Sequence, residues 1–263
     1  MSKRHLGMVQ KQFTKTLDAF SKFVVRDSAE TLAARVAFAM AQPDDLLLDV
    51  ACGPGTLVLA FAPLVKFARG VDVTAAMLKR AAEFQREQKI TNAAFDQADA
   101  DQLPYPDAAF SLVTCQFAFH HMAKPEAALT EMLRVTGREG RLMVVDTVAP
   151  ESDEKWELHN RVESIRDPSH TASLRLTGFL SMFERFGLEI VRQKLKRQPR
   201  SFNQWMLRAG LDPSQGRYQE ARKLIEDSIA TDGAGFSAQP QDGDLVIVHY
   251  EGVFLLQRRP GIA

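Results

Sequence analysis

Two adjacent histidines, His120 and His121, are the first residues of this 263-residue chain that could carry out chemistry. They lie in the stretch Gln-Phe-Ala-Phe-His-His-Met, just after an expected buried strand at residues 107–115. Open α/β sheets bind their ligands at the carboxyl ends of strands. An imidazole, with an ordinary pKa of about 6.5, can remove a proton from a bound substrate at neutral pH. The pair is therefore a candidate general base, and the alternative for each histidine is a structural role.

A strand, a glycine turn and a helix at residues 46–61 form a candidate ligand cradle. Apolar residues flank Asp49 on both sides, as expected of a parallel strand that is covered on both faces. Gly53 and Gly55 allow the backbone to turn sharply and a ligand to approach closely. This order of elements is typical of a nucleotide or nucleoside site at the carboxyl edge of an α/β sheet.

The turn fits neither of two common nucleotide motifs. A Walker loop requires Gly-Lys-Ser/Thr, whereas Thr56 and Leu57 follow Gly55. A dinucleotide fingerprint requires a third glycine two residues further on, and none is present. Asp72, about twenty residues beyond the turn, can accept hydrogen bonds from both ribose hydroxyls, a feature shared with NAD enzymes. It can also cap the helix expected from Thr74.

Together with the stretches downstream, the turn resembles motif I of the class I S-adenosylmethionine (SAM) methyltransferases. The family pattern is D-x-G-x-G-x-G, and residues 49–55 read D-V-A-C-G-P-G, with Ala51 in the first glycine position. Residues 99–110 read D-A-x-x-L-P-x-x-D-x-x-F, and residues 131–140 read E-M-L-R-V-T-G-R-E-G, which look like later family motifs. The resemblance covers residues 13–146. The small-molecule methyltransferases that share these motifs include the ubiquinone/menaquinone biosynthesis C-methyltransferases.

The resemblance implies SAM as the cofactor and S-adenosylhomocysteine as its product. It implies a cradle for the methionine part, a carboxylate on the ribose and contacts with the adenine, at these positions: Asp49, Ala51, Gly53 and Gly55 in the cradle; Asp72 on the ribose; Val73, Met77, Asp99 and Ala100 at the adenine; and Gln116 beside the methionine. The family often carries a histidine pair after its fourth strand and uses the second. His121 is therefore the first candidate for the base and His120 the second.

Methyl transfer from SAM is an in-line displacement at carbon, so the enzyme mainly aligns the methyl group with its acceptor. Alignment alone can lower a barrier by ~7–11 kcal/mol. An oxygen acceptor, or a carbon activated by a phenolate, also requires a base. The pattern [DN]-P-P-[YFW], which nitrogen methyltransferases acting on nucleic acids and proteins carry after strand four, is absent here. The resemblance therefore favours a small acceptor that is methylated on oxygen or carbon.

Three further residues are candidates for a substrate pocket. Phe20 belongs to an apolar helical face at residues 8–26, which is either a helix at the edge of the core or a lid. His170 lies in an Asp-Pro-Ser-His turn that resembles one in the cap of a family subgroup. Trp205 lies at helical spacing between Phe202 and Met206, and forms either the core of a cap or the wall of an aromatic substrate's pocket.

A basic stretch at residues 192–197 has two interpretations. It could meet an anionic substrate, or it could be the solvated face of an edge strand, where lysine discourages strand pairing. No cluster of His, Cys and Asp shows metal-ligand spacing, so we expect no metal.

Composition limits the partners that the chain can have. The 33 basic and 33 acidic residues give a formal net charge of zero, which argues against nucleic acid as a partner. The longest apolar run, residues 57–65, is far shorter than the ~20 residues of a membrane span. Two cysteines make no disulfide framework, and residues 1–12 show no signal peptide. We expect a cytoplasmic monomer or homodimer that acts on a small molecule.

Strands alternate with helices through Asp146, which predicts a doubly wound, Rossmann-like α/β sheet. The resemblance implies seven mostly parallel strands with an antiparallel last strand, and a helical cap over the active site. Residues 1–42 are expected to form amino-terminal helices or a lid, residues 43–147 the SAM-binding core, and residues 148–263 the remaining strands with the inserted cap helices.

The sequence thus predicts a SAM-dependent methyltransferase acting on oxygen or carbon of a small molecule of phenolic or quinone-like type. One alternative is a SAM-binding partner or sensor without turnover. A less favoured alternative is an NAD(P)-dependent oxidoreductase, because the third glycine and a Tyr-x-x-x-Lys pair are both absent.

Overall fold

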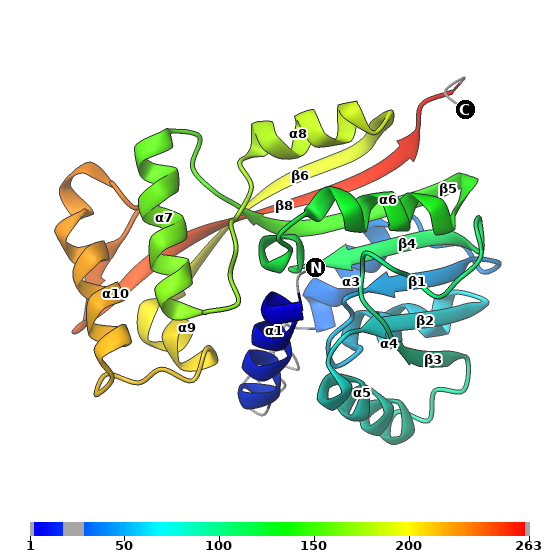
Figure 1. Ribbon diagram of the computed structural model, residues 1–263, viewed down its shortest axis with the longest axis horizontal. Helices are drawn as coiled ribbons and strands as arrows, with labels where there is room; N and C mark the ends of the chain where they lie inside the picture. The colour runs from blue at the N-terminus through cyan, green and yellow to red at the C-terminus, as the bar shows by residue number, and fades with distance from the viewer. Residues whose placement is uncertain (1–2, 18–28, 261–263) are drawn as a thin grey trace.

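The computed structural model describes residues 3–17 and 29–260. Seven strands follow one another in the sheet order β3-β2-β1-β4-β5-β8-β6 (Figure 1). Their bounds are β1 (Leu46–Val50), β2 (Phe67–Asp72), β3 (Ala93–Gln97), β4 (Phe110–Gln116), β5 (Thr136–Val148), β6 (Leu188–Ser201) and β8 (Asp244–Arg258). A short β7 (Gln239–Gln241) also pairs with β8. Pairing is parallel except along β8, which runs antiparallel to its neighbours. The predicted Rossmann-like sheet with an antiparallel last strand is confirmed.

Alternation along each strand sends side chains to two separate cores, because successive residues of a strand point to opposite faces. Leu47 of β1 belongs to the core covered by α3 (Ala29–Phe38), α4 (Thr56–Phe61) and α5 (Ala75–Glu87). Leu48 belongs to the opposite core, which α6 (Pro125–Val135) and α8 (Leu176–Arg185) cover. The sheet is therefore doubly wound, as the alternating pattern predicted.

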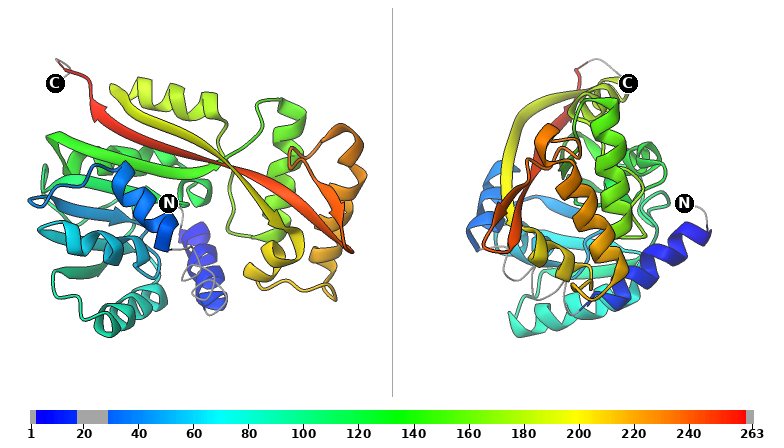
Figure 2. Two further views of the ribbon diagram at one scale, coloured as in Figure 1. Left: turned by 180° about the vertical axis from the view of Figure 1, so that it is seen from behind. Right: turned by 90° about the vertical axis from the view of Figure 1, so that its left-hand side faces the viewer.

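A third core lies beyond the main sheet. There β6 and β8 continue as a twisted two-stranded ribbon that carries α7 (Asp153–Arg166), α9 (Phe202–Arg208) and α10 (Gly216–Asp227) (Figures 1 and 2). Its buried centre includes Phe202, Trp205, Tyr218 and Phe236. These helices form the cap, and α1 (Lys3–Lys15) lies between the cap and the main sheet (Figure 1).

Two details of these elements bear on the predictions. The basic stretch at residues 192–197 lies within β6, at the edge of the sheet. The helix α3 ends at Phe38, and Met40 just beyond it is 38% exposed with a positive φ of 55°.

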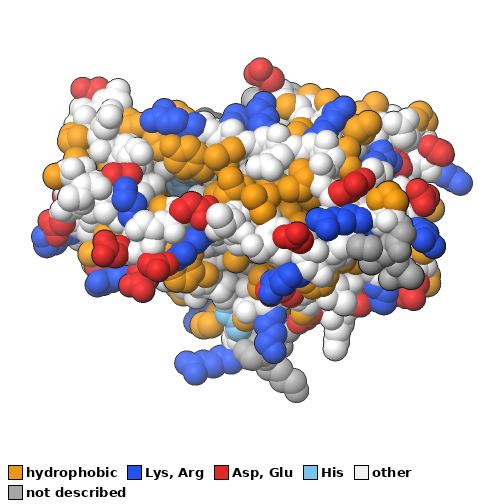
Figure 3. Space-filling model, turned by 90° about the horizontal axis from the view of Figure 1, so that it is seen from above, with side chains coloured by type: hydrophobic (Ala, Val, Ile, Leu, Met, Phe, Trp, Pro, Cys, Tyr) orange, Lys and Arg blue, Asp and Glu red, His pale blue; other side chains and the backbone are white. Residues whose placement is uncertain are grey.

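The surface matches the balanced composition. Figure 3 shows side chains of both charges interspersed around a group of hydrophobic side chains on the face that carries α8. On β6, Val191 and Leu195 are exposed among basic residues, in keeping with an edge strand whose lysines discourage further pairing. None of the helices within residues 3–17 and 29–260 is long and apolar enough to cross a membrane.

Candidate active site

A pocket of about 410 Å³ opens at the carboxyl edge of the parallel strands, where it meets α1 and the cap. Its lining comes from the ends of β1, β2 and β4, from the helices α1, α3, α4 and α5, and from the cap elements α7, β6, α9 and β8. Carboxyl ends of parallel strands converge at one edge of a sheet, so residues far apart in the sequence meet there.

Asp49 stands at the floor of this pocket, one residue before the end of β1. Its neighbour across the sheet is Thr114 of β4, whose Oγ1 donates a hydrogen bond to Asp49 Oδ1 at 2.6 Å. Burial raises the pKa of Asp49 to about 7, with the nearby Asp72 adding to the shift. A buried carboxylate in this position is stabilised by any ligand that brings a positive charge.

The glycine turn after β1 alternates left-handed residues, with φ values of 56° at Ala51, 54° at Gly53 and 75° at Gly55. Ala51 and Gly53 line the pocket. Gly55 does not, and a Cβ there would lie 2.6 Å from Phe95 Cε1 and 2.9 Å from Ala81 Cβ. Gly55 was expected in the cradle, but the structure places it outside the pocket lining. Its missing side chain instead lets α4 pack closely on β3 and α5.

Asp72 ends β2 and connects the turn to the next helix. Its Oδ2 accepts a hydrogen bond from the Gly53 amide at 2.9 Å, and its Oδ1 accepts one from the Thr74 amide at 2.8 Å. Burial raises the pKa of Asp72, and these N–H groups oppose the shift. Each carboxylate oxygen retains a second lone pair for a ligand. The carboxylate bonds to the start of α5 as well as lining the pocket.

The remaining residues expected at the cofactor also line the pocket: Val73, Met77, Asp99, Ala100 and Gln116. Met77 is 1% exposed. Gln116 Oε1 is buried, and no described residue donates a hydrogen bond to it. A buried acceptor of this kind indicates a ligand donor, because such groups are rarely left unsatisfied.

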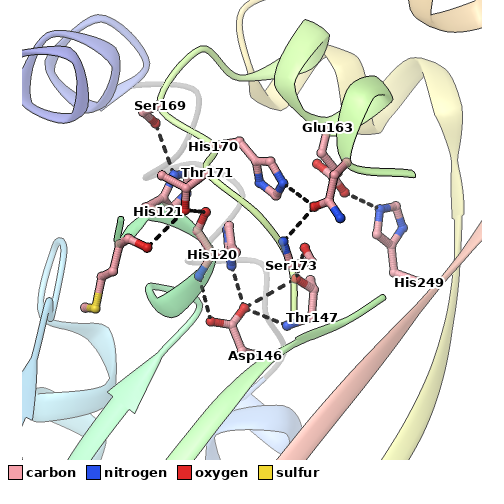
Figure 4. Close-up of polar contacts among 12 residues, drawn as sticks. His120, His121, Asp146, Thr147, Glu163, Ser169, His170, Thr171, Ser173 and His249 are labelled. Carbon is pink, nitrogen blue, oxygen red and sulfur yellow. Dashed lines mark hydrogen bonds and ion pairs between the residues drawn. The ribbon is translucent and has the colours of Figure 1, made fainter. Parts of the chain in front are cut away.

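His120 and Asp146 form a short contact beside this pocket (Figure 4). His120 Nδ1 lies 2.5 Å from Asp146 Oδ1, and Asp146 also accepts hydrogen bonds from the amides of His120 and Thr147. Burial alone would lower the pKa of His120, but the Asp146 carboxylate outweighs it and the pKa rises. Since Asp146 takes the Nδ1 hydrogen, Nε2 of neutral His120 is the nitrogen that can accept a proton.

His121 has a different environment, although it is adjacent in sequence. Its Nδ1 lies 3.1 Å from Ser169 Oγ, and that hydroxyl gives its single hydrogen to Asp167 Oδ1 at 2.6 Å. The hydrogen between His121 and Ser169 must therefore sit on Nδ1, which leaves Nε2 as an acceptor. Burial lowers the pKa of His121 to about 4, and the charge of His120 adds to the shift.

His170 was expected in the substrate pocket, and the structure places it outside the lining. Its Nε2 donates to Asn160 Oδ1 at 2.8 Å, and its ring lies 5.6 Å from that of His120 (Figure 4). Burial lowers its pKa to about 3. The next residue, Thr171, donates its amide and its hydroxyl to the His120 carbonyl, each at 2.8 Å. The Asp-Pro-Ser-His turn and the following Thr171 therefore help to hold the histidine pair in place.

The helix α1 covers the pocket from the other side. Val9, Gln12, Phe13 and Thr16 line the pocket, and the Phe13 ring meets the His121 ring edge-on at 5.1 Å. Gln10 Nε2 donates to the Val73 carbonyl at 3.0 Å. These contacts favour the lid interpretation of the amino-terminal segment. Phe20, the candidate from that segment, lies outside the described residues.

The cap supplies the rest of the wall, including residues that the sequence did not single out. Trp205 lines the pocket while remaining 2% exposed, so it serves both the cap core and the pocket wall. The Arg166 guanidinium lies 4.7 Å from the centre of the Trp205 ring. The pocket residues that sequence reasoning missed include nine charged or aromatic ones from the cap, from α3 and from the loop after β4: Arg35, Phe117, Glu163, Arg166, Asp167, Arg200, Arg208, His249 and Glu251.

Phe117 has a left-handed backbone conformation that the sequence did not predict. It follows β4 with a φ of 50°, a conformation uncommon for a bulky residue and frequent at functional sites. The Arg35 guanidinium lies 5.1 Å from the centre of its ring.

The residues at the sheet edge fit SAM, which carries a sulfonium, an ammonium and a ribose. Three carboxylates, Asp49, Asp72 and Asp99, lie in this half of the pocket and complement those cationic and hydroxyl groups. The buried Gln116 Oε1 can accept a hydrogen bond from the ligand, and Met77 offers an apolar surface for an adenine.

Comparison with known proteins finds methyltransferases among the relatives of this chain. A family model for a methyltransferase domain matches residues 48–144. The chain is 32% identical over 198 residues to the uncharacterized methyltransferase YcgJ of Bacillus subtilis, covering 75% of this chain and 78% of YcgJ. It is 37% identical over 108 residues to the ubiquinone/menaquinone biosynthesis C-methyltransferase UbiE of Azotobacter vinelandii, covering 40% and 43% of the two chains.

The fold comparison extends further along the chain. The crystal structure of a Bacillus halodurans C-125 protein superimposes with a TM-score of 0.81 and 30% identity, over 88% of this chain and 99% of that chain. The glycine turn, the sheet order and the long match to YcgJ are consistent with one another, and the chain belongs to the class I family of S-adenosylmethionine-dependent methyltransferases.

Proposed function

We propose that this protein transfers the methyl group of SAM to an oxygen, or to a carbon activated by a neighbouring hydroxyl, of a small phenolic or quinone-like molecule. Both reactions require removal of a hydroxyl proton from the acceptor. The observation that carries the proposal is the short contact of His120 with Asp146 beside a pocket whose other half fits SAM.

The cofactor half of the pocket holds SAM through charge and shape. Asp72 accepts hydrogen bonds from the ribose hydroxyls, Asp99 accepts one from the adenine amino group, and Met77 packs against the adenine. Asp49 and Gln116 face the methionine part, where Asp49 complements positive charge. When bound, SAM supplies an electrophilic methyl group with a good leaving group, so the protein's main task is alignment.

His120, rather than His121, is the residue that takes the proton. Asp146 holds its Nδ1 hydrogen and stabilises the imidazolium that forms when Nε2 accepts a proton. His121 is a weak base with a pKa of about 4, and its Nε2 is an acceptor that can orient the substrate hydroxyl. This order reverses the expectation from the family's histidine pair.

The lid and the cap shape the reaction volume. α1 and the cap wall both line the pocket, so a bound acceptor is surrounded by protein on the side away from the sheet. Exclusion of water strengthens the attraction between His120 and Asp146 during proton transfer. The neighbouring turn keeps both histidines in place through the Thr171 bonds to the His120 carbonyl.

Calorimetric titration of the purified protein with S-adenosylhomocysteine, with NAD⁺ and NADP⁺ as parallel controls, tests the cofactor assignment. We expect binding of S-adenosylhomocysteine alone. Methyl transfer from tritiated SAM to a panel of phenols and hydroquinones then tests the reaction. Binding without transfer to any of these acceptors would favour a SAM-binding protein without turnover, and binding of a nicotinamide nucleotide alone would overturn the proposal.

A further inference from the structure

The cap wall contains a histidine that the proposed reaction does not use. His249 of β8 lines the pocket, and 3% of its surface is exposed. Glu251, two residues further along the strand, lines the pocket as well, whereas Tyr250 between them does not. Because successive residues of a strand point to opposite faces, the ring of His249 lies on the pocket side of β8.

A buried carboxylate determines where the hydrogen of this ring lies. His249 Nε2 is 3.0 Å from Glu163 Oε1 of α7 (Figure 4). Burial alone would raise the pKa of Glu163, but its contact with His249 and the charge of Arg166 outweigh burial, and the pKa falls well below its ordinary value. An ionised carboxylate can only accept hydrogen bonds, so the hydrogen of this contact sits on Nε2.

The other ring nitrogen of His249 is therefore a hydrogen-bond acceptor. Burial lowers the pKa of His249 to about 3, and the charge of Arg200 adds to the shift, so the ring is neutral at neutral pH. A neutral imidazole with its hydrogen on Nε2 has a lone pair on Nδ1. His249 Nδ1 is buried, and no described residue donates a hydrogen bond to it.

A second cap histidine, His159, cannot supply the missing hydrogen, although its ring centre is 6.3 Å from that of His249. His159 Nδ1 lies 3.1 Å from the Ala234 carbonyl oxygen, and burial lowers its pKa. The neutral ring thus donates from Nδ1 and keeps a lone pair on Nε2, and two acceptors cannot bond to each other. Buried acceptors are rarely left unsatisfied, so His249 Nδ1 indicates a donor on the ligand that fills the pocket.

Trp205 gives the same part of the wall an aromatic surface. Its ring lines the pocket, with its centre 5.1 Å from that of the His249 ring. Aromatic ligands pack on such a surface, and their O–H or N–H substituents need an acceptor when they are buried. An ether, carbonyl or carboxylate oxygen of the ligand would instead set its own lone pairs against that of Nδ1.

We propose that His249 selects the methyl acceptor by accepting, at Nδ1, a hydrogen bond from a second O–H or N–H group of that molecule. This inference rests on the proposed methyl transfer at the same site. The methyl acceptor then carries one hydroxyl at His120 and a further donor at the cap wall. A site that binds such a donor discriminates strongly against an analogue without it, because the analogue leaves a buried polar atom unpaired.

Titration of the protein saturated with S-adenosylhomocysteine tests the inference, using aromatic probes that differ in one substituent. Hydroquinone is compared with 4-fluorophenol and resorcinol with 3-fluorophenol, because fluorine replaces a hydroxyl at similar size and has no hydrogen to donate. The corresponding aminophenols carry an N–H donor at the same positions. We expect at least one donor-bearing probe to bind about tenfold or more tightly than its fluorophenol.

The identity of the tighter probe distinguishes the two kinds of donor. Preference for a dihydroxy probe would identify an O–H donor, and preference for an aminophenol an N–H donor. Equal affinity of the donor-bearing probes and their fluorophenols, or binding of none of these compounds, would overturn the inference.

Two substitutions separate the two nitrogens of His249. In His249→Gln the side-chain amide takes the position of Nε2 and can donate to Glu163, but no acceptor remains at the position of Nδ1. In His249→Asn an amide oxygen takes the position of Nδ1. We expect the preference for the donor-bearing probe to disappear in His249→Gln, with fluorophenol affinity unchanged, and to be retained in His249→Asn. Full preference in His249→Gln would contradict the role of Nδ1.

His159→Asn is the matched control, since His159 is a buried cap histidine that does not line the pocket. Its amide can still donate to the Ala234 carbonyl, and we expect the preference of the wild type. An equal loss of preference in this variant would show a general effect of the cap and contradict the assignment. The affinity for S-adenosylhomocysteine and the thermal unfolding midpoint report separately on the cofactor site and on folding.

Nitrogen-15 NMR of histidine-labelled wild type gives a second test that needs no substitution at His249 to fold. Binding of the preferred probe should shift the Nδ1 signal of His249 while Nε2 keeps its hydrogen, and an Nδ1 signal that does not move would contradict the proposed bond. Both readouts measure binding alone. A preference for the donor-bearing probe without methyl transfer would therefore contradict the proposed function and still support the role of His249.

Discussion

His120 and Asp146 come from the loop after β4 and from β5, and they meet at 2.5 Å between Nδ1 and Oδ1. Nδ1 of the neighbouring His121 lies instead 3.1 Å from the hydroxyl oxygen of Ser169. Two adjacent histidines therefore have opposite pKa shifts, upward for His120 and down to about 4 for His121. Environments that separate two titratable groups in this way are typical of acid–base sites.

Asp146→Asn should impair catalysis through His120. The amide cannot stabilise an imidazolium, so we expect kcat/KM to fall by ~10²–10⁴-fold. A base must be unprotonated, so the rate of the wild type falls as pH drops through the raised pKa of His120. In Asp146→Asn the acidic limb of the profile should move to lower pH. The measurement is the pH dependence of methyl transfer to an acceptor found in the phenol panel.

Ser169→Ala is the matched control for that profile, because it removes the partner of His121 and leaves Asp146 in place. We expect a smaller loss of rate and an acidic limb at the wild-type position. A limb that moves in Ser169→Ala but not in Asp146→Asn would assign the base to His121.

Asp49→Asn should stabilise the free protein at neutral pH and weaken SAM binding. The pKa of Asp49 is about 7 in the folded chain, against 3.8 as its ordinary value. The folded state thus holds a proton that the unfolded state has released, and the associated stability is lost as pH rises from about 4 to about 7. Removing this effect should raise the free energy of unfolding at pH 8 by about 2–4 kcal/mol.

Urea unfolding at pH 5 and pH 8, together with calorimetry using SAM, checks both parts of this prediction. The wild type should lose stability between the two pH values relative to Asp49→Asn, while the variant binds SAM about tenfold or more weakly. Parallel pH dependence in the two proteins would show that Asp49 is ionised in the folded chain at both pH values.

Asp72→Asn should weaken binding of S-adenosylhomocysteine by ~1.5–3 kcal/mol, because it replaces charge-assisted hydrogen bonds to the ribose by neutral ones. Asparagine keeps one acceptor oxygen for the Gly53 or the Thr74 amide, so this variant perturbs the turn less than alanine would. Asp96→Asn is the control, since Asp96 binds Arg69 and Tyr105 outside the pocket lining. Unchanged affinity in Asp72→Asn would remove Asp72 from the ribose site.

Ala51→Gly should raise the free energy of unfolding by about 0.5–1 kcal/mol, because Ala51 has a left-handed φ of 56° that glycine adopts without penalty. Ala60→Gly, within α4, should instead lower it by a similar amount. Denaturant unfolding of the two variants gives opposite signs if the turn is strained at Ala51. A loss of stability in both would contradict the strain.

The structure brings most of the residues predicted for the cofactor to one pocket, because their sequence signals are local. Asp49, Ala51 and Gly53 lie within five residues, and one strand–turn–helix unit places them. Asp72 and Gln116 end neighbouring parallel strands, so the sheet order alone brings them to the same edge. Gly55 was the exception, since its contact with Phe95 depends on how closely α4 packs on β3.

The cap half could not be predicted from local spacing. Arg166, Arg200 and His249 come from α7, β6 and β8, and only the long pairing of β6 with β8 brings them together. His170 was expected to line the pocket, but a turn motif does not define the direction of its side chain. In the structure this side chain bonds to Asn160 instead. The carboxylate that gives His120 a different environment from His121 belongs to Asp146, which lies 26 residues further along the chain.

A nitrogen-15 NMR titration of histidine-labelled protein in complex with S-adenosylhomocysteine tests the central claim most directly. Ring nitrogen shifts report both the pKa and the tautomer of each histidine, and single histidine-to-glutamine variants assign the signals. We predict that His120 titrates above its ordinary pKa with its hydrogen on Nδ1, while His121 stays neutral down to about pH 4. A His121 that titrates near neutral pH beside a His120 that does not would contradict the assignment of the base.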